Sequence, residues 1–246
     1  MGILSTLLYR TRSMWPPLKF NGLLVPVAGD HISLQIWKTL WKQCYEGPEI
    51  LAVNQLVKPG DKILEMGSGI GVVSAIASKI SPDIQIEAYE ANPSLIKFIQ
   101  HLHKLNDIEN VHVNNAILLP TNKETSRKLN LHTHFTESSI LDAIESEQSV
   151  EIPVKDFRKV LKDFRPDVLI CDIEGGEEEL FNGIDLSGFR AIILEIHPHL
   201  ISRKTIKRIY DLCAHSNLYP CIEYSGAQVV AFERIEVSEI LVEQAV

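Results

Sequence analysis

One stretch decides the fold of this 246-residue chain: Lys62-Ile63-Leu64-Glu65-Met66-Gly67-Ser68-Gly69-Ile70-Gly71. Apolar residues lead to an acidic one, glycines then occupy every second position, and apolar residues return at Val72, Val73, Ile76, Ala77 and Ile80. This order predicts a buried strand, a tight turn and a helix that packs back on the strand. Glycine is needed in such a turn because a side chain would keep the backbone away from a ligand.

The spacing of the glycines separates two cofactors. In a nicotinamide-binding turn the last glycine lies three residues after the second, but that position is Val72 here. Glu65 also places a negative charge before the turn, where a diphosphate is unfavourable. The pattern resembles motif I of the class I methyltransferases, whose cofactor, S-adenosylmethionine (SAM), is cationic and has no phosphate. We therefore expect SAM, with a nicotinamide oxidoreductase or a turn without ligand as alternatives.

Strand and helix patterns alternate after the turn, which is typical of a parallel sheet with right-handed crossovers. The expected parallel strands follow the apolar runs at 62–66, 84–90, 111–114, 167–172 and 191–197. Two more strands at 220–224 and 228–232 are predicted to form an antiparallel hairpin at the sheet edge. The fold class is thus α/β: a doubly wound, mostly parallel seven-stranded sheet with a C-terminal antiparallel hairpin.

The chain divides into two predicted parts. Residues 1–58 are expected to form an N-terminal arm and helical cap, and residues 59–246 a SAM-binding domain. An insert at about 117–150 is polar and lacks periodicity, so we expect an irregular lid or substrate loop there. In the cap, a core role is favoured for Trp37, Trp41 and Tyr45 over a substrate wall.

The end of the second strand carries a candidate ribose ligand, Glu90, 25 residues after Glu65. In open α/β sheets, ligands bind outside the carboxyl ends of the strands, and a carboxylate there can accept both ribose hydroxyls. The next strand ends at Asn115 and Ala116, where adenine would lie. The predicted cofactor site comprises Glu65, Gly67, Ser68, Gly69, Gly71, Glu90, Ala91, Asn115, Ala116 and Asp172.

Two further motifs end the fourth and fifth strands: Asp172-Ile173-Glu174-Gly175 and Glu195-Ile196-His197-Pro198. Together with the glycine turn and Tyr89-Glu90-Ala91-Asn92-Pro93, they resemble the FkbM family of SAM-dependent methyltransferases over roughly residues 45–200. The resemblance implies O-methylation of a hydroxyl on a sugar, glycan or natural product. The chain departs from the family pattern at Glu65, Ser68 and Gly69, and at Ile170, where the family often has lysine.

The predicted catalytic residues are Asp172, Glu174, Glu195 and His197. Methyl transfer from a sulfonium requires in-line alignment with the acceptor and, for a hydroxyl, removal of a proton. We expect Asp172 to position the reactants and His197 or Glu195 to take the proton. A histidine that merely binds a neighbouring carboxylate is an equal alternative for His197. The four residues could also hold a divalent metal for a diol acceptor, but this ligand set suits magnesium or manganese only poorly to moderately, and no metal is expected.

Composition limits the partners. The net charge is −8 without a dense Lys/Arg run, so a nucleic acid partner is disfavoured. The expected partner, a small-molecule or glycan hydroxyl, is what the family resemblance implies. A non-catalytic SAM-fold binding module is the alternative, and the complete set of site residues counts against it. Four widely spaced cysteines indicate free thiols in a reducing compartment. No apolar run reaches the ~20 residues of a membrane span, so we expect a cytoplasmic protein. The oligomeric state stays open.

Overall fold

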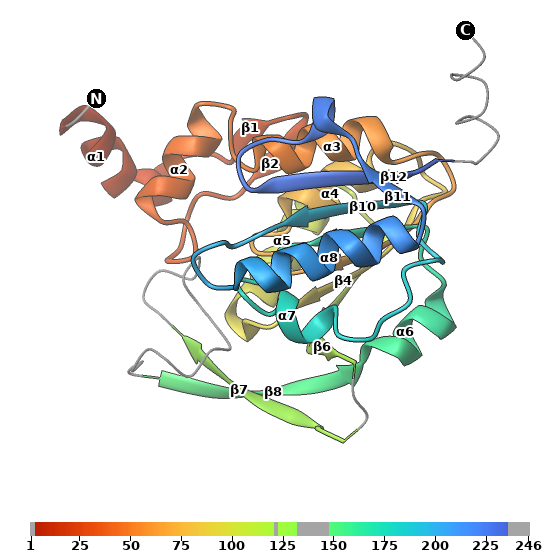
Figure 1. Ribbon diagram of the computed structural model, residues 1–246. Coiled ribbons are helices and arrows are strands. Elements are labelled where there is room, and N and C mark those ends of the chain that lie inside the picture. The colour runs from red at the N-terminus through yellow and green to blue at the C-terminus, as the bar shows by residue number, and fades with distance from the viewer. Residues whose placement is uncertain (1–2, 121–122, 132–147, 236–246) are drawn as a thin grey trace, which may run out of the picture.

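A computed structural model describes residues 3–120, 123–131 and 148–235. Its central sheet has seven strands in the order β11-β12-β10-β9-β3-β4-β5 (Figure 1). The strands are β3 (Lys62–Met66), β4 (Gln85–Glu90), β5 (Val111–Asn115), β9 (Val168–Cys171), β10 (Ala191–Glu195), β11 (Leu218–Pro220) and β12 (Val229–Arg234). The five from β10 to β5 are parallel, whereas β12 runs antiparallel to both of its neighbours. The predicted fold class is confirmed.

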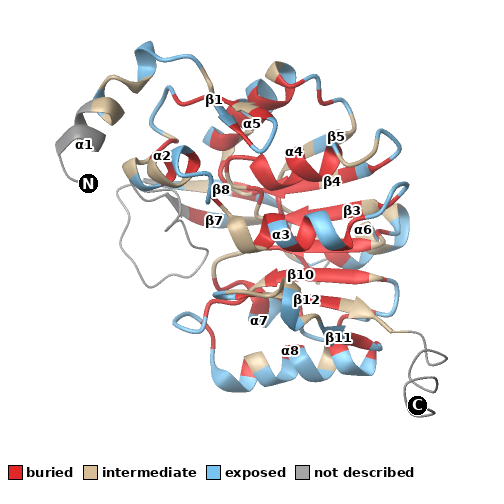
Figure 2. Ribbon diagram, turned by 90° about the horizontal axis from the view of Figure 1, so that it is seen from above, coloured by how far each residue is buried: buried red, intermediate tan, exposed pale blue. Residues whose placement is uncertain are grey.

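Helices cover both faces of this sheet, because alternate strand residues point to opposite faces. In β3, Ile63 packs in the core beneath α3 (Gly47–Leu56), α4 (Val72–Ser78) and α5 (Pro93–Leu105). Its neighbour Leu64 packs on the other face, with α6 (Phe157–Phe164), α7 (Glu177–Leu180) and α8 (Arg203–His215). Figure 2 shows the strands buried between these layers, with the outer side of α8 exposed. Both faces are therefore closed, as a parallel sheet requires.

The N-terminal segment adds to the first of these cores. It consists of α1 (Ile3–Arg10), a 3-10 turn (Arg12–Met14), the hairpin β1 (Leu18–Phe20) and β2 (Leu23–Val25), and α2 (Leu34–Trp41). Trp37 and Tyr45 are buried in the same cluster as Ile63, while Trp41 is half exposed and stacks on Trp37. The core role predicted for Trp37 and Tyr45 is therefore confirmed. The division at residue 58 stays a prediction, although both sides of it share one core.

The insert differs from its prediction. Its described residues form a second sheet in the order β6-β8-β7, with β6 (Ile117–Leu119), β7 (Ser126–Leu131) and β8 (Gln148–Asp156). The prediction of an irregular segment over 117–150 was thus wrong for these residues. Antiparallel pairing with β8, which lies further along the chain, orders the polar β7. Arg127 of β7 also donates to the carboxylates of Glu124 and Glu179, which ties β7 to α7. His132 and His134 lie outside the described residues.

The C-terminal hairpin is present with shifted bounds. Residues Ile222–Tyr224 form a 3-10 turn rather than a strand, and β11 ends at Pro220. The four cysteines are all free thiols, as expected. In the described part of the chain, no helix is long and apolar enough to cross a membrane.

Candidate active site

The glycine turn after β3 is held by the tips of its two neighbouring strands. The amide of Gly67 donates to the carbonyl of Tyr89 at the end of β4 (2.9 Å). On the other side, the amide of Asp172 donates to the carbonyl of Met66 (2.9 Å). Gly67 has φ +81°, and a Cβ there would overlap the backbone carbonyl of Asp172. Gly71 has φ +76°, and its Cβ would lie 2.7 Å from Ile99. Both positions therefore require glycine.

Glu90 connects the end of β4 to this turn. Its Oε2 accepts from the amide of Gly69 (2.8 Å), and its Oε1 accepts from the amide of Asn92 (2.7 Å). The side chain is buried, and burial raises the pKa of Glu90 to about 7 even though these amides favour the charged form. Each oxygen keeps a lone pair for a further donor. The carboxylate is thus fixed where a ribose would lie outside the strand ends.

A cavity of about 120 Å³, open to solvent, lies along these strand ends. Six of the predicted site residues line it, namely Gly67, Glu90, Ala91, Ala116, Asp172 and Glu174. Apolar walls come from the second sheet through Ile117, Leu119 and Leu129. The cavity thus joins the predicted ribose and adenine positions to the predicted acceptor side.

The remaining predicted cofactor residues lie behind the cavity wall. Glu65 is 1 % exposed beneath the turn, where burial raises its pKa and the hydroxyls of Ser68 and Ser74 partly offset that rise. The Asn115 amide donates to the carbonyls of Glu90 and Ala91 (both 2.9 Å), so it fixes the β4 end. Ser68, Gly69 and Gly71 shape the turn itself. These five residues support the cavity without lining it.

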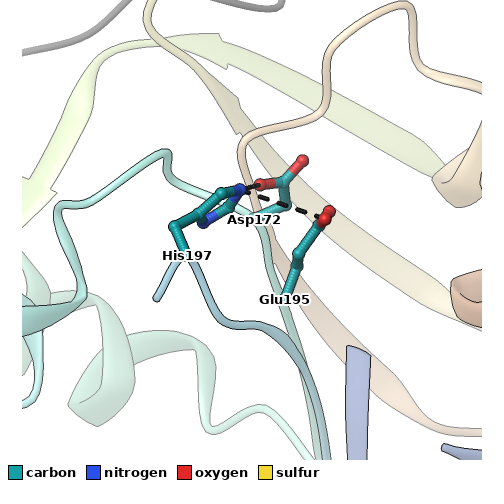
Figure 3. A group of neighbouring side chains, drawn as sticks. All are labelled: Asp172, Glu195 and His197. Atoms are coloured by element: carbon teal, nitrogen blue, oxygen red, sulfur yellow. Dashed lines mark ion pairs between the residues drawn. The ribbon is translucent and has the colours of Figure 1, made fainter. Parts of the chain in front are cut away.

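The four predicted catalytic residues come together around His197. Figure 3 shows three of them, Asp172, Glu195 and His197. Nε2 of His197 lies 3.3 Å from Glu174 Oε2, 3.5 Å from Asp172 Oδ1 and 4.0 Å from Glu195 Oε1. The His197 side chain is 5 % exposed, whereas Asp172 and Glu174 each retain about a third of their surface. Oδ1 of Asp172 has no hydrogen-bond partner. Nε2 of His197 therefore lies among three carboxylates, two of which, Asp172 and Glu174, line the cavity.

Glu177 orients this histidine and was not predicted from the sequence. Glu177 begins α7, is fully buried, and its Oε1 lies 2.8 Å from Nδ1 of His197. Because an ionised carboxylate only accepts, Nδ1 donates and Nε2 is left for the site. Burial of the ring lowers the pKa of His197, but the Glu177 hydrogen bond and the charges of Glu174, Glu177 and Glu195 outweigh burial and raise it. In the sequence, the acidic run Glu177–Glu179 indicates only residues that favour the start of a helix, and nothing in it points to His197.

Two more carboxylates, also missed, approach from α3. Glu46 caps this helix, Glu49 lies in its first turn, and both reach the Glu195 side of the cluster. Burial and the charge of Glu46 raise the pKa of Glu49 to about 8. Burial and the charges of Glu195 and Glu174 raise the pKa of Asp172. The site is therefore rich in negative charge and suits a cationic ligand.

Comparison with known proteins supports the class of cofactor. Residues 27–144 match the family model of the TRM5/TYW2 methyltransferase domain, just under half of the chain. SAM is therefore the cofactor, and the chain is a class I SAM-dependent methyltransferase. The matching model is TRM5/TYW2 and not FkbM, so the FkbM resemblance stays a prediction. No curated protein matches the chain.

Several solved structures are similar at low identity. A precorrin-6y C5,15-methyltransferase from Geobacter metallireducens is 16% identical, over 78% of this chain and 89% of that chain, with a TM-score of 0.48. M. jannaschii TYW2 in complex with AdoMet is 17% identical, over 88% and 85%, with a TM-score of 0.41. Trm5b from Pyrococcus abyssi is 16% identical, over 87% and 54%, with a TM-score of 0.45.

The family match overturns one prediction. A nucleic acid partner was disfavoured from the sequence because the net charge is −8. The TRM5/TYW2 family acts on tRNA, so the exclusion of a nucleic acid partner is contradicted. Net charge failed as a criterion because binding depends on local charge near the contact, which an acidic total does not describe.

Gly67→Ala is expected to abolish SAM binding in calorimetry and to lower the melting temperature. The added Cβ would overlap the Asp172 carbonyl, so the two strand tips must separate. Gly188→Ala is the matched control, since a Cβ at that exposed glycine meets nothing within 4 Å. Normal SAM affinity in Gly67→Ala would contradict the close packing of the turn.

SAM binding is expected to strengthen about tenfold from pH 6 to pH 8 through Glu90. With a pKa of about 7, its carboxylate changes from mostly protonated to mostly ionised over this range, and only the ionised form accepts from both ribose hydroxyls. Glu90→Gln is expected to bind weakly and to lose this part of the pH dependence, measured by calorimetry at both pH values. An equal pH dependence in wild type and variant would assign it to another group.

Proposed function

We propose that this protein transfers a methyl group from SAM to an RNA nucleotide, at an acceptor atom that gives up a proton. The match of residues 27–144 to the TRM5/TYW2 domain carries the RNA part of the proposal, because that family acts on tRNA. The carboxylate–histidine cluster supports the proton transfer. A cytoplasmic location, predicted from the sequence, is part of the proposal.

Each polar residue of the site has a distinct task in this reaction. SAM supplies an activated methyl group on a positively charged sulfur. Glu90 holds the ribose, and the carboxylate of Asp172 lies on the side of the cavity where the positive methionine end would be stabilised. His197 accepts the proton of the acceptor through Nε2, while Glu177 holds the ring by Nδ1. An acceptor with a dissociable proton, a hydroxyl or a ring N–H, fits this arrangement.

O-methylation of a sugar, glycan or natural-product hydroxyl is a second candidate. It is favoured by the motifs at Asp172–Gly175 and Glu195–Pro198, on which the FkbM resemblance rests. Both motifs lie beyond residue 144, outside the part matched by the TRM5/TYW2 domain. They hold the acceptor side of the site, whereas the matched part holds the glycine turn and Glu90.

Methyl transfer from labelled SAM should distinguish these acceptors. With the wild-type protein, we expect labelled methyl groups in unmodified tRNA transcripts. With His197→Ala, loss of the base should lower the rate of this transfer about 10²–10⁴-fold. Parallel reactions contain oligosaccharide and polyketide hydroxyls. Label only in these would favour the second candidate. Absence of transfer to every acceptor, with SAM bound, would leave the binding-module alternative.

The pH–rate profile should report His197. Because its pKa is raised above the usual 6.5, kcat/KM is expected to rise with pH through that higher pKa and then level off. Glu177→Gln keeps an oxygen acceptor for Nδ1 but removes the charge, so the acidic limb should move to lower pH. Glu178→Gln, on the exposed side of the same helix, is the matched control. If the acidic limb of the pH–rate profile does not shift in Glu177→Gln, Glu177 has no role in positioning His197.

A further inference from the structure

A group of three carboxylates shares Glu195 with the catalytic cluster, and its other two members, Glu46 and Glu49, have no assigned role. Glu46 and Glu49 come from the start of α3, and Glu195 comes from the end of β10. One carboxylate oxygen from each lies within 4.8 Å of the other two. Such distances fit the oxygen ligands of one divalent cation, which bind at roughly 2.0–2.6 Å from the metal.

The second observation is the state of Glu49. This side chain is only 6 % exposed, and its Oε2 has no hydrogen-bond partner. A buried carboxylate without a donor is strongly unfavourable, and it is usually paired or bound to a metal. The oxygen without a hydrogen-bond partner thus belongs to one of the three carboxylates whose separation suits a cation.

The protein itself offers little positive charge here. Within the described ranges, none of these three carboxylates forms an ion pair with lysine or arginine. The ion-pair contact of Glu195 is with Nε2 of His197, at 4.0 Å. The N-terminus of α3 favours nearby anions only weakly, by less than the cost of burying an ion. Without a cation, a proton must neutralise part of the group, in agreement with the raised pKa of Glu49. A divalent cation would supply the positive charge in place of that proton.

We propose that Glu46, Glu49 and Glu195 bind one divalent cation of the oxygen-preferring class, Mg²⁺, Mn²⁺ or Ca²⁺. The all-carboxylate ligand set favours these ions over zinc or copper, which prefer imidazole and thiolate. Glu195 also lies next to His197 and Asp172, so the cation is placed on the acceptor side of the cavity. The inference does not rest on the proposed function, because binding is measurable without SAM or acceptor.

A neighbouring arrangement must be distinguished. Asp172, Glu195 and His197 also lie close enough to share an ion, and Glu195 belongs to both groups. Glu49 belongs only to the proposed site, which makes it the diagnostic residue. Asp172 belongs only to the neighbouring one. Variants at these two positions therefore separate the sites.

Manganese is the probe for the test. We expect the full chain, without SAM, to bind one Mn²⁺ in an electron paramagnetic resonance titration, with Mg²⁺ and Ca²⁺ as competitors. Glu49→Gln should weaken binding at least tenfold, whereas Asp172→Asn should change it less than threefold. Glu109→Gln, an exposed glutamate far along the chain, is the matched charge control. Mn²⁺ should raise the melting temperature of wild type but not of Glu49→Gln.

Two outcomes would overturn the proposal. Failure of the wild-type chain to bind Mn²⁺ at millimolar concentration would exclude the site. Loss of binding in Asp172→Asn with normal binding in Glu49→Gln would place the ion at the neighbouring group instead. A Glu49→Gln chain that melts no lower than metal-free wild type shows that lost binding is not lost folding. Either result leaves the methyl-transfer proposal to its own assay.

Discussion

The close contact between Gly67 and the carbonyl of Asp172 is the constraint on which the site depends. The tips of β3 and β9 approach so closely there that no side chain fits between them. The amide of Gly69 is then free to reach Glu90 at the end of β4. Three strand ends are thereby fixed relative to one another by backbone groups. The cavity is formed by this rigid edge, and its acidic side chains are placed by it.

Negative charge is the second organising feature. Asp172, Glu174 and Glu195 face Nε2 of one histidine, and Glu177 holds the other nitrogen. Like charges so close together are unfavourable unless protons or cations compensate them, which is why burial and mutual repulsion raise the pKa of Asp172. A sulfonium cofactor contributes one positive charge at this edge. The folded chain therefore binds this cofactor with electrostatics that are already in place.

How much could be predicted from the sequence depends on how far apart along the chain the interacting residues are. The turn at Gly67 and the strand end at Glu90 were predictable, because local spacing encodes them. His197 and Asp172 could be placed together since both follow parallel strands. Glu177 and Glu49 could not, because they reach the site from helices whose packing no local pattern specifies. β7 was missed for a similar reason: its partner β8 lies far along the chain.

The second sheet gives the cavity a wall that the glycine turn does not supply. Leu119 and Leu129 line the same space as Gly67 and Glu90, yet they come from a segment between β5 and β9. An adenosine analogue bearing an apolar substituent toward these leucines would gain contacts absent from methyltransferases that share the turn alone. This wall is accordingly the place to seek a selective inhibitor.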